Sequence, residues 1–197
     1  MIVVKKLQNK NIKWYDCNYY IDGQCSGELC EYFKERTAAG LICYEDIVQE
    51  CYKDLKLYHL NKRLAQLVRN FDGEIFLNTI HRSRFFTVCR IQNLSVELKN
   101  SIYLAALFLF TADNKLWCST KEHTYLDRFD FKKMHLNGIN TDGYALYQTA
   151  RTIFTGREYI KTDEIADETL IGDGVFKAIT NATLIAKYGE DMFRVNC

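Results

Sequence analysis

Residues 98–117, LKNSIYLAALFLFTADNKLW, decide the fold of this chain. Residues 102–110 leave almost no polar side, and a helix that is apolar all round has to be buried on several faces at once. The dense apolar part is only about half of the ~20 residues that a helix needs to cross a bilayer, and charged residues flank it. We therefore predict a buried central helix over 98–117 and no membrane span.

The length and composition are typical of a globular protein. A chain of 197 residues can hold one large domain or two small ones, since domains cluster near ~100–150 residues. Hydrophobic residues make up 48% and charged residues 26%, which argues against disorder. The formal net charge of +1 gives no overall field that would favour nucleic acid or a membrane. Because the pattern changes after Asn93, we predict two domains, 1–93 and 94–197.

The second half has a helical pattern throughout. After the central helix and a polar stretch over 121–140, apolar residues at helical spacing predict a helix that starts at Thr141 or Asp142 and stops at Gly156. A short acidic helix is expected from Thr162, and a last helix from Asp173 to Gly189. We expect these helices to form an all-α half that packs on the central helix.

The first half has a mixed pattern. Residues 1–21 alternate like a β-hairpin, and Ser26 starts a predicted helix. Residues 44–71 form a long helical pattern whose register slips near 59–61, which predicts a kink or two helices. Residues 74–80 and 84–91 are rich in β-branched and aromatic residues and predict a second hairpin with its turn at 81–83. The order is ββ-αα-ββ, so we predict an α+β fold with a small antiparallel or mixed sheet in this half.

Two groups of residues could hold a metal ion. The first is four of the eight cysteines, Cys25, Cys30, Cys43 and Cys51, but their spacing fits structural zinc poorly and reduced core thiols are the favoured interpretation. The second lies in the polar stretch at 122–135 and comprises Glu122, His123, Asp127, Asp130 and His135. A polar loop between helices would carry such residues anyway, so we expect no cofactor and keep a metal-dependent enzyme as an alternative.

A binding surface is expected on the two hairpins of the first half. Tyr, Trp and Arg are the residues most enriched at binding hot spots. Such residues gather on the hairpins at Lys13, Trp14, Tyr15, Tyr19, Arg82, Arg84 and Phe86. Basic and aromatic residues on one sheet could also bind phosphates and stack bases, so nucleic acid is an alternative partner. The plainer interpretation is that lysines protect exposed strand edges from aggregation.

Three stretches of the second half carry a resemblance: YLAALFLFTADNKLW at 103–117, DGYALYQTARTIFTG at 142–156 and AITNATLIAKYG at 178–189. They resemble the C-terminal region of small proteins of phages and conjugative elements of low-GC Gram-positive bacteria. The resemblance transfers no functional residue and implies an accessory protein of a mobile element. In that setting, small proteins without catalytic motifs are often inhibitors of host defence, anti-CRISPR proteins among them.

These observations lead to one expected function. We expect a non-enzymatic protein-interaction or inhibitor protein whose partner is a protein, such as a nuclease complex of host defence. The N-terminus has no secretory pattern, so we expect the cytoplasm as the compartment. The oligomeric state is left open.

Overall fold

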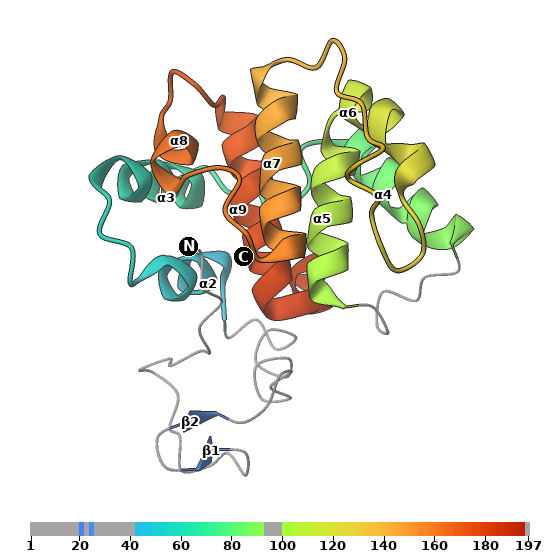
Figure 1. Cartoon of the computed structure of the whole chain (residues 1–197). Coiled ribbons are helices and arrows are strands. Elements are labelled where there is room, and N and C mark those ends of the chain that lie inside the picture. Colours follow the sequence, from blue (N-terminus) through green and yellow to red (C-terminus); the bar gives the residue numbers. More distant parts are fainter. Residues whose placement is uncertain (1–19, 22–23, 26–41, 93–99, 196–197) are drawn as a thin grey trace.

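The computed structural model describes residues 20–21, 24–25, 42–92 and 100–195, and helices predominate in them (Figure 1). The helices are α2 (Tyr44–Tyr52), α3 (Tyr58–Arg69), α4 (Thr79–Ile91), α5 (Ser101–Ala112), α6 (Asn114–Thr120), α7 (Thr141–Thr155), α8 (Thr162–Ala166) and α9 (Asp173–Tyr188). Short 3-10 helices cover Lys121–His123 and Gly189–Arg194. Two strands of two residues each, β1 (Tyr20–Ile21) and β2 (Gln24–Cys25), pair antiparallel.

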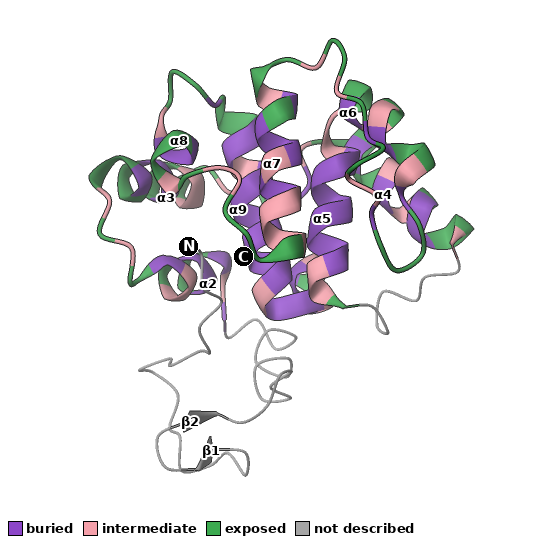
Figure 2. Cartoon of the chain, in the orientation of Figure 1, coloured by how far each residue is buried: buried purple, intermediate pink, exposed green. Residues whose placement is uncertain are grey.

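Helix α5 is the centre of the molecule. It packs mainly against α7 and α9, and Figure 1 shows these three helices side by side. Every residue from 103 to 111 is buried, and the burial continues through most of α9 (Figure 2). This burial agrees with the expectation of a helix that is covered on all sides. Among the described residues, no helix combines the length and the apolar character needed to span a membrane.

The central helix is shorter than the sequence predicted. Asp113 has extended backbone, with φ −115° and ψ 140°, and ends α5 after Ala112. Its carboxylate accepts a hydrogen bond of 2.8 Å from the backbone N–H of Leu116 and so caps the start of α6. The helix is therefore interrupted at Asp113, and two helices, α5 and α6, take the place of the single helix expected over 98–117.

The α+β prediction is wrong, because the segment assigned to a second hairpin is helix α4. Asn78 starts this helix, since its side chain accepts a hydrogen bond of 2.9 Å from the backbone N–H of His81. The buried residues of α4 are His81, Phe85, Val88 and Cys89, which fall on one helical face. Packing of this face on α5 overrides the strand preference of the aromatic and β-branched residues. The described part of the chain is therefore mostly all-α.

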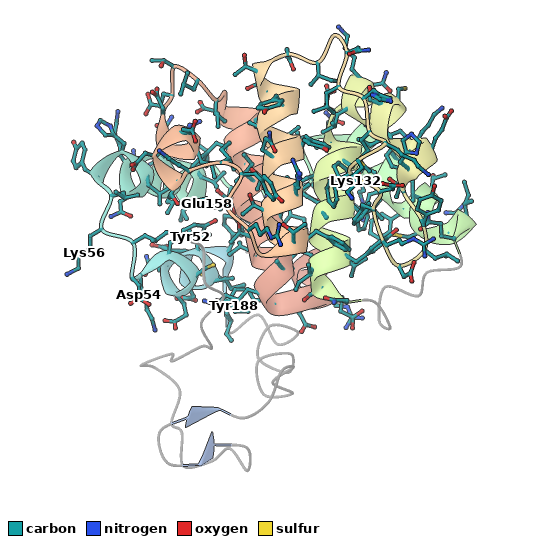
Figure 3. All side chains as sticks on the ribbon, viewed as in Figure 1. Tyr52, Asp54, Lys56, Lys132, Glu158 and Tyr188 are labelled. Atoms are coloured by element: carbon teal, nitrogen blue, oxygen red, sulfur yellow. The ribbon has the colours of Figure 1, made fainter. Side chains whose placement is uncertain are left out.

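The remaining helices follow the sequence pattern more closely. The long pattern over 44–71 is divided into α2 and α3, with the break at 53–57 instead of 59–61. Asp54 and Lys56 in this connection are exposed and point outward (Figure 3). Helix α7 ends at Gly156, which adopts the left-handed φ of 70° that glycine tolerates. Of the hairpin expected over 1–21, only residues 20–21 are described, in β1; the rest of it and the helix expected from Ser26 lie outside the described residues.

A buried polar bridge connects elements from both sides of residue 93. The hydroxyl of Tyr44 in α2 donates to Asn181 Oδ1 in α9 at 2.6 Å. The Nδ2 of the same Asn181 donates to the backbone carbonyl of Ile75 at 2.8 Å. Both polar ends of the Asn181 amide are thereby satisfied in a residue with 0% exposure. The division into domains at residue 93 stays a prediction.

His81 fastens α4 to the central helix. The backbone N–H of Leu77 donates to His81 Nδ1 at 3.2 Å, and His81 Nε2 lies 2.9 Å from the backbone carbonyl of Phe108. With Nδ1 accepting, Nε2 must carry the proton, so the ring is neutral and uses both nitrogens. The pKa of His81 is lowered to about 4, mainly by burial; the bond to Phe108 opposes this shift and the charge of Arg84 contributes to it.

This pKa predicts an acid-sensitive fold. The ordinary pKa of 6.5 applies to the unfolded chain, so between that value and about 4 the unfolded state binds more protons than the folded state. Stability is then fully present above pH 6.5 and falls as the pH is lowered. We expect the free energy of unfolding to be about 2 kcal/mol lower at pH 5 than at pH 7.5, as measured by urea unfolding at both pH values. In His81→Gln, which keeps a donor for Phe108 but does not titrate, most of this difference should disappear. An equal pH dependence in both proteins would contradict the assignment.

Candidate functional site: a pocket between α3 and α8

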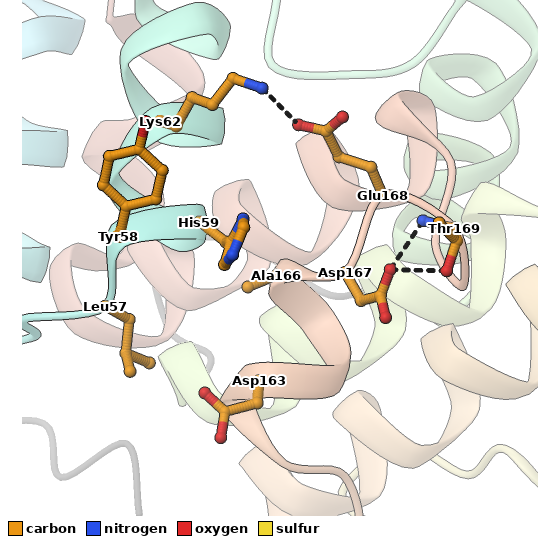
Figure 4. A pocket seen from close by; sticks show the side chains of 9 residues that line it. All are labelled: Leu57, Tyr58, His59, Lys62, Asp163, Ala166, Asp167, Glu168 and Thr169. Carbon is orange, nitrogen blue, oxygen red and sulfur yellow. Dashed lines mark hydrogen bonds and ion pairs between the residues drawn. The ribbon is translucent and has the colours of Figure 1, made fainter.

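A pocket of about 500 Å³ opens between the start of α3 and the segment around α8 (Figure 4). Its volume falls within the ~300–1,000 Å³ of typical ligand sites. The α3 wall is formed by Leu57, Tyr58, His59 and Lys62. Tyr58 is 78% exposed, so its ring stands at the rim, and its edge meets the His59 ring at 5.4 Å between centroids.

The opposite wall is formed by α8 and the turn that follows it. It contributes Asp163, Ala166, Asp167, Glu168 and Thr169. The Oδ1 atom of Asp167 accepts two hydrogen bonds from Thr169, 2.8 Å from its backbone N–H and 2.7 Å from its hydroxyl. These bonds lower the pKa of Asp167, which keeps the carboxylate ionised. Lys62 joins the two walls through an ion pair of 3.5 Å with Glu168 (Figure 4).

Behind the pocket, Arg63 holds the two walls together. Its guanidinium is buried, with 3% exposure, and donates to the backbone carbonyls of Ile165 at 3.1 Å and Ile171 at 2.9 Å. It also lies 3.1 Å from the exposed carboxylate of Asp173 and 4.1 Å from the centroid of the Phe176 ring. Arg63 and Lys62 are neighbours in the sequence, yet one faces the interior and the other faces solvent. The inner residue therefore fixes the geometry of a pocket that it does not line.

The pocket has an excess of negative charge. One lysine faces three carboxylates, those of Asp163, Asp167 and Glu168. The rest of the lining comprises the largely apolar Leu57, Ala166 and Tyr58 ring, together with His59 and Thr169. A concave site with apolar walls and a few charged groups is suited to binding and orienting a group of opposite charge.

Comparisons of the chain with models of protein families, with curated proteins and with solved structures found no match.

The two arginines expected on a hairpin tip lie on helix α4. Arg82 is exposed and forms an ion pair of 2.9 Å with Glu74. Arg84 is half-buried, and its guanidinium donates to the backbone carbonyl of Thr111, near the end of α5, and to Asn114 Oδ1 at 3.1 Å. Arg84 therefore satisfies polar groups at a helix end, and the part of both arginines in a binding surface stays a prediction.

Phe86 lies in an aromatic cluster and not on an open strand. Its ring centroid is 5.6 Å from that of Phe76, 5.3 Å from that of Phe85 and 6.0 Å from that of Phe193. The other residues of the expected binding surface lie outside the described residues: Lys13, Trp14, Tyr15 and Tyr19.

The candidate metal ligands do not gather into a site in the described part of the chain, where no group of three or more His, Cys, Asp or Glu side chains could hold an ion. In the 122–135 segment, Asp130 pairs with Lys133 at 3.4 Å and Asp127 lies 3.8 Å from Arg128. Glu122 and His135 are exposed, and His123 is half-buried.

Of the four cysteines, Cys25 lies in β2 and Cys30 lies outside the described residues. Cys43 and Cys51 are half-buried thiols, and the Cys43 thiol donates to Asp46 Oδ2 at 3.2 Å. Burial raises the pKa of the Cys51 thiol to about 11, which disfavours the thiolate that zinc requires.

Reasoning from the sequence did not find the pocket. The pattern around Asp163 and Glu164 was interpreted only as the start of a short acidic helix. Tyr58 falls in the amphipathic helical pattern of 44–71, and Lys62 carries no signal of its own. The one signal available was the excess of acidic residues at 163–168, which does not show where a pocket lies.

Proposed function

We propose that this protein is a non-enzymatic interaction protein that acts by binding another protein and inhibiting it. We further propose that it is an accessory protein of a phage or mobile element and works in the cytoplasm of a bacterium. A nuclease complex of host defence, as targeted by anti-CRISPR proteins, is the partner that this context favours. The resemblance of the second half to proteins of mobile elements motivates that choice.

The observation that carries the proposal is the contrast between the buried polar groups and the exposed pocket. His81, Arg63 and Asn181 all donate to backbone carbonyls of neighbouring elements, so their polar groups serve the fold. The α3–α8 pocket instead combines charged groups with a tyrosine that is 78% exposed. Tyrosine is enriched at hot spots because a rigid, amphipathic ring gives a large contact area. The combination of charged groups and an exposed tyrosine supports binding of another molecule more than it supports catalysis.

The experiment compares variants of two exposed tyrosines. Tagged wild-type protein, Tyr58→Ala and Tyr144→Ala are used to recover partners from nuclease-treated lysate of a low-GC Gram-positive bacterium. Tyr144 on α7 is 51% exposed and does not line the pocket, so it is the matched control. We expect wild type and Tyr144→Ala to recover the same protein. Tyr58→Ala should reduce its recovery by about tenfold or more, as loss of a hot spot does.

Two other results would contradict the proposal. Recovery of nucleic acid from untreated lysate, with binding that falls steeply as salt is raised, would favour the nucleic-acid alternative. Turnover of a nucleotide or nucleic acid by the purified protein, abolished by one substitution, would show an enzyme.

A further inference from the structure

The α3–α8 pocket has features that select the chemistry of its ligand. Its apolar parts, Leu57 and Ala166, are suited to the aliphatic stem of a side chain. Its rim carries the rings of Tyr58 and His59, and aromatic faces attract flat cations. The charged residues of the opposite wall are acidic. A ligand that complements all three features has an aliphatic stem and a planar cationic head.

Two of the carboxylates are available to such a head. Lys62 offsets the charge of Glu168 across the pocket. Asp167 accepts both Thr169 bonds at its Oδ1 atom, and the backbone N–H of Leu170 also acts on its carboxylate, which lines the pocket. In the same part of the chain, Asp163 forms no hydrogen bond or ion pair, and its carboxylate lies at the α8 edge of the pocket (Figure 4). The two Thr169 bonds hold Asp167 in place before a ligand arrives, which reduces the entropy lost on binding.

We propose that this pocket binds the side chain of an arginine on the surface of the partner protein, an inference that rests on the proposed function. Guanidinium offers several N–H donors in a fixed plane, which suits carboxylate acceptors and an aromatic rim together. An anionic ligand would meet two uncompensated carboxylates. A neutral apolar ligand would bury those carboxylates without a partner, which is costly. The pocket therefore recognises a charged residue of the partner, and Tyr58 covers the guanidinium from the rim.

The test uses a pair of small probes that differ only in whether the side chain ends in a guanidinium group. N-acetyl-arginine amide is titrated into the full chain, and NMR signals of Tyr58 and His59 report binding. N-acetyl-citrulline amide has nearly the same shape but carries a neutral urea group, so it is the matched probe. We expect saturable shifts with the arginine probe and at least about fivefold weaker binding of the citrulline probe, because the charge contact is lost. Free arginine should bind more weakly than the amide, since its own carboxylate faces Asp163 and Asp167.

Variants assign the effect to the pocket. Asp167→Asn keeps an oxygen that can accept from Thr169 and removes the charge, so the fold should be retained. It should weaken binding of the arginine probe by about fivefold, whereas Asp127→Asn, in the exposed segment 125–128, should leave that binding unchanged. Equal binding of the two probes, no saturable shift, or tighter binding of free arginine than of the amide would overturn the inference.

The same variants separate this inference from the proposed function. If Asp167→Asn loses the probe but still recovers the partner at the wild-type level, the pocket is not the contact surface. The inference then fails and the proposed function stands. If no protein partner is recovered although the probe binds selectively, the proposed function fails, and the assignment of the arginine to a partner protein fails with it.

Discussion

Phe108→Ala is expected to lower the free energy of unfolding by about 3–5 kcal/mol, the usual cost of removing a fully buried aromatic ring. Phe108 has 0% exposure at the centre of α5. Its ring centroid lies 4.4 Å from that of His81, 5.2 Å from that of Phe76 and 6.1 Å from that of Phe85. Truncation leaves a cavity that these rings, held by their own neighbours, can fill only in part. Urea denaturation followed by circular dichroism measures the change.

The control for Phe108→Ala is Ile80→Ala in α4. Ile80 is 66% exposed, so its truncation should change stability by less than about 0.5 kcal/mol. A loss below ~1 kcal/mol for Phe108→Ala would mean that α5 is not the buried centre of the fold.

Arg63→Ala is expected to lower the free energy of unfolding by about 2–4 kcal/mol, because it leaves buried carbonyl groups without hydrogen-bond donors. The guanidinium bonds the backbone on both sides of the turn after α8, at Ile165 and Ile171. Most of the cost should come from these carbonyls and from the Phe176 contact. The ion pair with Asp173 adds little, since that side chain is 85% exposed. Hydrogen exchange should show faster exchange over 162–171, and the arginine probe should bind more weakly as the pocket loosens.

Lys62→Ala is the matched control for Arg63→Ala, because the two residues are adjacent on α3. The Lys62 side chain is 57% exposed and its pair with Glu168 is on the surface, so its loss should cost less than ~1 kcal/mol. If the two variants were equally stable, Arg63 would not hold the walls of the pocket.

The local sequence determined the helices whose apolar positions repeat with helical period. The run at 102–110 required a buried helix because it offers no polar face to solvent. Gly156 marked the end of α7 because glycine accepts a left-handed backbone without a steric penalty. The pattern of 44–71 likewise indicated two helical segments. In each case the helical pattern is produced by residues that are close in the sequence, so it can be recognised without knowing the tertiary structure.

Tertiary structure decided the segment at 79–91 and the pocket. Thr, Val and Phe favour strands locally, but His81 and Phe85 gain more by packing on one helical face against Phe108. The sequence does not show that the Arg84 guanidinium binds the backbone carbonyl of Thr111 near the end of α5; this contact exists only because α4 packs beside α5. The pocket exists because Lys62 and Glu168, far apart in the chain, meet where Arg63 binds the turn after α8. The periodicity of the sequence indicates which residues of a helix face inward. A site depends on which helix faces lie next to one another, and this arrangement is fixed only when the helices pack.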